Sequence, residues 1–162
     1  SGKDVTIQVG GRPPSRDAWS DAELRAAAAG AAGPSTTGES VLRLLFVHGS
    51  SEHGDDALGV AVAGDVAAVF VDRVADAAVG LTSTSALVDA VTMHEVGHLL
   101  GLVDLVLGTG RADPEHPGHS RSRGSVMYWA VESSLIGDLL TGGPPRDFDA
   151  ADRADLAAIR GG

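Results

Sequence analysis

The stretch "TMHEVGHLLGLVD" at residues 92–104 contains the pattern on which the interpretation of the whole chain depends. His94 and His98 are four residues apart, so on a helix they lie one turn apart on the same face and can direct ring nitrogens at one metal ion. Glu95 lies one residue further round the helix, where its carboxylate can reach a water bound to that ion but cannot act as a third ligand. Because such short patterns also arise by chance, the surrounding sequence has to decide between a metal site and an ordinary helix.

A long helix is predicted around this pattern. It begins at a Ser or Thr cap among residues 82–85 and runs to about Leu100. Leu87 and Val91 share one face with the two histidines at helical spacing. Gly101 ends the helix, because glycine adopts a left-handed conformation without the steric cost of a β-carbon. The pattern is therefore expected on a helix that stops shortly after the second histidine.

The rest of the chain alternates between short apolar segments and segments rich in helix-forming residues. Strands are predicted at 5–9, 41–47, 58–64 and 66–74, and further helices at about 18–32 and 147–160. The second of these strands is apolar enough for burial on both faces, and the last two are joined near Gly64 and Asp65. Asp147 or Asp149 lies near the start of the final helix, where an acidic residue can cap free backbone N–H groups.

The composition limits both the partners and the metal chemistry. The chain has 162 residues, 43% of them apolar, which suffices for one ordinary core and one domain. Its 22 acidic residues outnumber 12 Lys and Arg, and no basic run is present, so we expect neither nucleic acid nor an anionic membrane surface as a partner. We also expect neither a membrane span nor a signal peptide in this sequence. Because cysteine is absent, His, Asp or Glu must hold any transition metal.

A longer pattern surrounds the two histidines. It reads His94-Glu95-x-x-His98-x-x-Gly101 and is followed by Met127 in "SVMYW". In this form the chain resembles the metzincins, a clan of zinc endopeptidases in which the helix stops at that glycine, a third ligand follows, and a turn containing a methionine underlies the zinc. The resemblance covers most of the chain. It implies zinc as the cofactor, the two histidines as metal ligands, Glu95 as the catalytic residue and Met127 as the methionine of the turn.

The resemblance also implies a fold and a location. The fold would be an α+β, zincin-like domain with a twisted mixed sheet, an active-site helix and a small C-terminal subdomain. A single metallopeptidase catalytic domain would occupy residues 3–162, with an upper subdomain at about 3–101 and a lower one at about 102–162. The location would be extracellular, or tethered to a membrane outside the cell.

Two residues compete for the role of third ligand. Asp104 stands three residues after the glycine, where the clan usually has histidine, and zinc accepts carboxylate oxygens. His119 is followed by Ser120 and stands eight residues before Met127, a spacing typical of the matrixin branch of the clan. We favour His119, with residues 104–118 as an insertion, and keep Asp104 as the alternative.

Other residues are weaker candidates for metal binding. His116 is expected to be a solvated loop residue. Glu132 as a ligand would follow the gluzincin pattern and would leave the glycine and the Met-turn unexplained. The loop "EHGDD" at 52–56 is expected to be solvated and acidic.

Together these residues predict a zinc-dependent endopeptidase. Glu95 would deprotonate a zinc-bound water for attack on the peptide carbonyl and would then pass the proton to the leaving amine. The chain is expected to be a monomer that binds a peptide or protein substrate, extended along the edge strand at 58–64. A zinc-binding module without peptidase activity and a hydrolase of small amides are the alternatives. A cleft open at both ends would favour protein substrates, and a closed pocket would favour the small amide.

Overall fold

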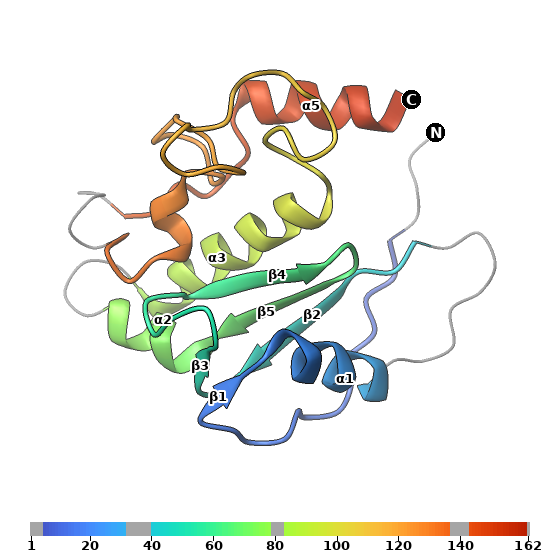
Figure 1. Cartoon of the computed structure of the whole chain (residues 1–162), viewed down its shortest axis with the longest axis vertical. Coiled ribbons are helices and arrows are strands. Elements are labelled where there is room, and N and C mark those ends of the chain that lie inside the picture. Colours follow the sequence, from blue (N-terminus) through green and yellow to red (C-terminus); the bar gives the residue numbers. More distant parts are fainter. Residues whose placement is uncertain (1–4, 32–39, 79–82, 137–142, 162) are drawn as a thin grey trace.

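A three-stranded mixed sheet lies between two helices in the computed structural model, which describes residues 5–31, 40–78, 83–136 and 143–161 (Figure 1). The elements in chain order are β1 (Ala18–Trp19), α1 (Asp21–Ala31), β2 (Arg43–Val47), β3 (Ser50–Ser51), β4 (Gly59–Ala63), β5 (Val66–Phe70), α2 (Val71–Ala77), α3 (Thr84–Leu99), η1 (Trp129–Glu132) and α5 (Ala150–Gly161). This mixture of helices and a small mixed sheet agrees with the predicted α+β class. Among the described residues, no helix combines the length and apolar character needed to span a membrane.

The sheet has the order β2-β5-β4, with β5 parallel to β2 and antiparallel to β4. All five residues of β5 are buried. Val66 and Phe70 pack into a cluster with Trp19 and Leu24 on the side of α1, whereas Val69 packs into a second cluster on the side of α3. This alternation follows from the pleat of a strand, which directs successive side chains to opposite faces. Helices therefore cover both faces of the central strand.

Burial of both faces was predicted for the strand at 41–47, and the structure shows that this expectation is wrong. β2 lies at an edge of the sheet, and α3 packs on β4 and β5 instead of β2. Leu44 and Phe46, on the uncovered face, are 38% and 47% exposed. The apolar composition of residues 41–47 correctly predicted a strand. Whether a helix covers both of its faces depends on where the helices cross the sheet, which the composition does not determine.

Two other predicted strands also differ from the structure. Residues 5–9 form no strand, and the side chains of Val5, Ile7 and Val9 are exposed. An alternating pattern gives a segment the preference for a strand, but a strand forms only where another edge pairs with it. The strand predicted at 66–74 ends at Phe70, because α2 begins at the next residue.

The predicted helix around the histidine pattern is confirmed. α3 begins after Ser83, whose side chain accepts a hydrogen bond from the backbone N–H of Ala86 at 3.2 Å. It ends before Gly101, which has a φ of 82°, as the left-handed conformation requires. A β-carbon at this position would also lie 2.3 Å from Cγ2 of Val106. The cap and the glycine therefore fix the two ends of the helix that carries the site.

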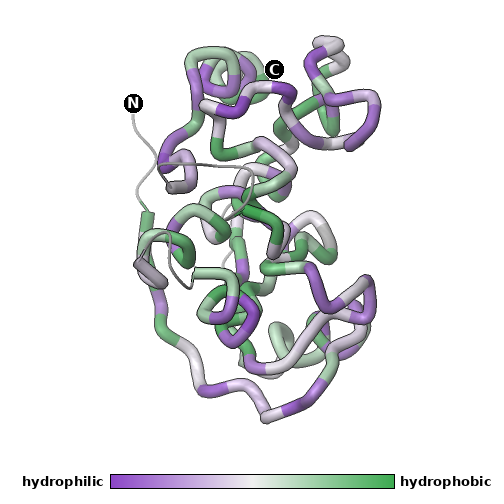
Figure 2. Tube along the Cα trace, turned by 90° about the vertical axis from the view of Figure 1, so that its left-hand side faces the viewer, coloured by the Kyte–Doolittle hydropathy of each residue, from purple (hydrophilic) through white to green (hydrophobic). Residues whose placement is uncertain are grey.

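The chain after α3 forms the upper part of the molecule in Figure 1, built from loops, η1 and α5. Asp149 caps α5 as predicted, because its Oδ1 accepts hydrogen bonds from the N–H groups of Ala151 and Asp152 at 2.8 and 2.9 Å. Hydrophobic segments run through the middle of the molecule, and hydrophilic segments are frequent in the peripheral loops (Figure 2). The long loop between α3 and η1 packs its His119 ring against the two histidines of α3.

Candidate metal centre

Three histidines from two distant segments meet at one point. The Nε2 atoms of His94 and His98 are 3.0 Å apart, as expected for residues one turn apart on α3. The ring centroid of His119, from the long loop, lies 5.1 Å from that of His94 and 4.9 Å from that of His98. The structure therefore brings the two helical histidines together with the residue favoured as the third ligand.

A carboxylate completes the cluster. Glu132, the last residue of η1, places Oε2 at 3.4 Å from Nε2 of His94 and Oε1 at 2.8 Å from Nε2 of His119. One donor atom from each of the three histidines and from Glu132 lies within 4.8 Å of all the others. We call these four residues the metal cluster. From the sequence we gave Glu132 little weight as a ligand, and the structure places its carboxylate beside the three histidines.

A backbone carbonyl fixes the orientation of the His94 imidazole. The side chain is fully buried, and Nδ1 lies 2.7 Å from the carbonyl oxygen of Val126. Since a carbonyl can only accept a hydrogen bond, Nδ1 carries a proton, and Nε2 is the ring nitrogen that faces the cluster. Metal-binding histidines are commonly held in this way.

The charges in the cluster also suit a metal. Burial, followed by the nearby His94 and His119, lowers the pKa of His98 to about 3, so the ring is neutral at neutral pH and its lone pair is free. Burial raises the pKa of Glu132, but its contacts with His119 and His94 outweigh that effect and hold the pKa below its usual value. Neutral imidazoles and an ionised carboxylate are the forms in which these groups bind a metal.

Glu95 lies outside the metal cluster. Its side chain is 0% exposed, and neither carboxylate oxygen forms a hydrogen bond with the described residues. Burial, together with the charge of Glu132, raises the pKa of Glu95 well above its usual value. A β-carbon at Gly59, the first residue of β4, would lie 2.5 Å from Oε1 of Glu95. The carboxylate is thus enclosed between α3 and the start of β4.

An unpaired buried carboxylate is rare in folded proteins, because it has lost its hydration without gaining a partner. Both oxygens of Glu95 are in this state. A metal centre with a water beside this carboxylate would supply the missing partner. The donor set of the cluster and the unpaired oxygens of Glu95 therefore both fit a bound metal ion.

Asp104, the alternative third ligand, does not lie in the metal cluster. Its carboxylate accepts hydrogen bonds from the N–H groups of Thr109, Gly110 and Ala112 and from the Thr109 hydroxyl, at 2.7 to 3.0 Å. These hydrogen bonds, chiefly the one from the N–H of Ala112, lower the pKa of Asp104 to about 2. The carboxylate therefore organises the loop that follows α3.

His116, the weaker candidate in the same loop, also lies outside the cluster. Its ring stacks on that of Trp129, with centroids 4.1 Å apart and planes inclined by 6°. Its Nδ1 is 3.2 Å from a carboxylate oxygen of Asp113. These contacts give His116 a structural role, and its ring lines the same cavity as His119 and Trp129.

A second group with metal-binding side chains lies near the start of α1. Asp21, Glu52 and His53 place donor atoms within 4.8 Å of one another. His53 already contacts Asp21 at 2.9 Å, and Glu52 accepts a hydrogen bond from the Asp21 N–H. Glu52 and His53 are exposed, so this group agrees with the predicted solvated loop.

Met127 packs directly against α3. It is fully buried, and a β-carbon at Gly97 would lie 2.2 Å from its sulfur atom. Its carbonyl oxygen accepts a hydrogen bond at 2.8 Å from the N–H of Ser120, the neighbour of His119. The turn that contains Met127 therefore contacts the helix of His94 and His98 and also helps to position the loop of His119.

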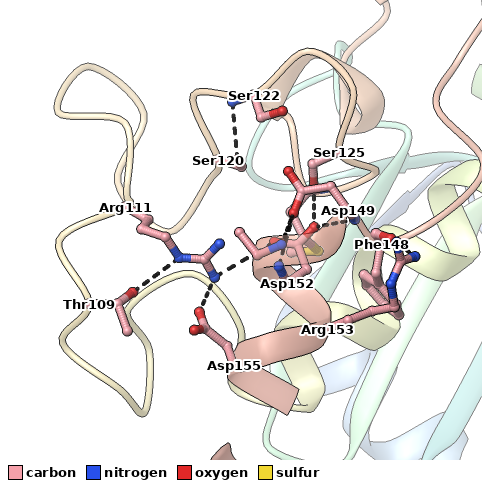
Figure 3. A network of polar contacts seen from close by, with 12 residues as sticks. Thr109, Arg111, Ser120, Ser122, Ser125, Phe148, Asp149, Asp152, Arg153 and Asp155 are labelled. Atoms are coloured by element: carbon pink, nitrogen blue, oxygen red, sulfur yellow. Dashed lines mark hydrogen bonds and ion pairs between the residues drawn. The ribbon is translucent and has the colours of Figure 1, made fainter. Parts of the chain in front are cut away.

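The turn is held in place by α5. Figure 3 shows Asp152 beside Ser125 and Asp149, with Arg111 between Thr109 and Asp155. The buried Asp152 carboxylate accepts a hydrogen bond from the Ser125 hydroxyl, which in turn accepts one from the N–H of Met127 at 2.9 Å. The C-terminal helix thus holds the turn of Met127, which packs against α3 below the candidate metal centre.

Asp152→Ala is expected to lower the free energy of unfolding by about 1–3 kcal/mol, because it leaves the Ser125 hydroxyl and the Asp149 N–H without their shared acceptor. Urea unfolding of the full chain measures this change. Asp147→Ala, which removes an exposed carboxylate from the same segment, is the control and should change the value by less than about 0.5 kcal/mol. Equal effects of the two substitutions would contradict the supporting role of Asp152.

Comparison of the chain with known protein families, curated proteins and solved structures gave no match.

Proposed function

We propose that the chain is a zinc-dependent endopeptidase of the metzincin clan, with a matrixin-like site. The single observation that carries this proposal is the cluster of His94, His98 and His119 together with the buried carboxylate of Glu95, which follows His94 on α3 and has no hydrogen-bond partner among the described residues. A structural zinc site has no use for such a carboxylate. A hydrolytic site requires it, because the attacking water has to lose a proton.

The donor set supports zinc as the metal. Three imidazole nitrogens with a carboxylate nearby are typical of zinc sites in proteins without thiolate ligands. His94, His98 and His119 would hold the ion. When bound there, zinc would supply a Lewis acid that lowers the pKa of a water and polarises a peptide carbonyl.

Glu95 is placed for the proton transfers of hydrolysis. Burial raises the pKa of its carboxyl group above the usual value, which makes the ionised carboxylate a stronger base. It would accept a proton from the attacking water and donate it to the nitrogen of the departing amine. The enclosure of Glu95 by Gly59 and α3 excludes bulk water from this transfer.

The free edge of β4 supports an extended peptide as the substrate. β4 is an edge strand, so its outer N–H and C=O groups can pair with the main chain of a peptide. Two cavities of about 450 and 460 Å³ share Val60, Pro117 and Glu132, and one is lined by His98 and the other by His119. Space on both sides of the cluster favours a long substrate over a small amide.

Digestion of a peptide library by the zinc-loaded full chain, followed by mass spectrometry, tests this function. We expect cleavage at internal bonds that stops when a chelator removes the metal and resumes when zinc is restored. Cleavage of small amides alone would support the small-amide hydrolase. Bound zinc without hydrolysis of either substrate would support a zinc-binding module and contradict the proposed endopeptidase.

A further inference from the structure

Glu132 lies where a fourth ligand of the metal would be. Nitrogen and oxygen ligands sit at about 2.0–2.1 Å from zinc, so two ligands of a tetrahedral site are about 3.3–3.4 Å apart. The distance from Oε2 of Glu132 to Nε2 of His94 is 3.4 Å, and the distance between the Nε2 atoms of His94 and His98 is 3.0 Å. The distance from Glu132 to His94 therefore matches the spacing expected of two ligands of one zinc ion.

Hydrogen bonds join Glu132 and the residues that follow it to the segment that leads into β4. The Glu132 carbonyl accepts a hydrogen bond from the N–H of Leu58 at 2.7 Å. The N–H and the hydroxyl of Ser134 donate to the carbonyl and the carboxylate of Asp56 at 2.9 and 3.0 Å. We call this pairing of residues 56–58 with residues 132–134 the clasp. It holds the Glu132 carboxylate next to the histidines.

We propose that Glu132 is a fourth protein ligand of the resting metal centre and has to leave it before a peptide can be cleaved. This inference rests on the proposed function, because it assigns a closed state to the same site. Catalytic zinc sites keep one position open for water or substrate, whereas sites with four protein ligands are closed. Glu132 would therefore occupy the position on the metal that water or the substrate needs.

The clasp gives a reason why a substrate would release Glu132. A peptide that extends along β4 beyond Gly59 reaches the backbone groups of residues 56–58, which the clasp already uses. Pairing of the peptide with this segment would replace the bonds to residues 132–134 and free the carboxylate to move. Long peptides should then open the site more readily than short ones.

The test uses the full chain with cobalt(II) in place of zinc, because the visible spectrum of cobalt reports its ligands. Azide serves as the probe of an open position. In the wild type, azide should leave the spectrum unchanged, whereas in Glu132→Gln it should bind and shift the spectrum. Zinc affinity should fall by at least about 10-fold in Glu132→Gln, because the loss of a direct ligand should cost no less than the loss of a group that only supports one. Glu115→Gln, at an exposed site in the loop of His119, is the control.

Peptide hydrolysis separates the two proposals. If Glu132→Gln cleaves peptides with a higher kcat/KM than the wild type and binds azide, both proposals hold. A changed spectrum without hydrolysis by either protein supports the fourth ligand and contradicts the peptidase. Azide binding to the wild type, or an unchanged zinc affinity in Glu132→Gln, overturns the fourth ligand even if peptides are cleaved.

Glu132→Asp covers the case in which Glu132→Gln does not fold. It keeps the charge and withdraws the carboxylate by one methylene group, so the proposal again predicts azide binding and weaker zinc binding. If this variant retains the affinity and spectrum of the wild type, the carboxylate is not a ligand and the proposal fails.

Discussion

Glu95→Gln is expected to lower the rate of peptide hydrolysis by about 10²–10⁴-fold, which is the contribution typical of a positioned general base. Glutamine has nearly the same shape and so fits the space beside Gly59, but it cannot accept the proton of the attacking water. Because Glu95 lies outside the metal cluster, the variant should bind zinc with the affinity of the wild type. Initial rates on a peptide substrate, with the zinc content of the same samples, measure both effects.

Glu115→Gln is the matched control, because it makes the same chemical change at an exposed position. It should alter neither rate nor zinc content. Hydrolysis by Glu95→Gln at the rate of the wild type would contradict the role of Glu95 as the base. Loss of zinc from Glu95→Gln would instead place this carboxylate among the groups that hold the metal.

His119→Ala is expected to weaken zinc binding by more than about 100-fold, because removal of a direct ligand should exceed the effect of removing a group that only supports one. The long loop places the ring of His119 next to both helical histidines. Competition with a chelating dye measures the affinity. Hydrolysis should fall with it at limiting zinc.

Asp104→Ala separates the two candidates for the third ligand. Its carboxylate binds the backbone of residues 109–112, so its removal should loosen this loop and leave zinc affinity within about tenfold of the wild type. The opposite pattern, in which Asp104→Ala loses zinc and His119→Ala keeps it, would identify Asp104 as the ligand. The spacing of His119 from Met127 would then be without functional meaning.

The helix that carries the site could be predicted from the sequence with both of its ends. Ser83 caps α3 through a bond to a residue three positions on, and Gly101 ends it with a positive φ, so both signals act within a few residues. The spacing of His94 and His98 is likewise a local property of a helix. Such features depend little on the rest of the fold, which is why the sequence predicts them well.

Features that depend on distant segments were harder to predict. Glu132 joins the cluster because residues 132–134 pair with residues 56–58, a contact between segments more than seventy residues apart in the chain. No spacing rule connects these segments. The same applies to β2, whose apolar face stays exposed because α3 crosses the other two strands of the sheet.

The most direct test of the central claim is the zinc content of the purified full chain, measured by elemental analysis after exposure to zinc and removal of the unbound metal. The metal cluster of three histidines and Glu132 predicts one zinc ion per chain. A chain that retains no zinc would contradict the metal centre and, with it, the proposed peptidase.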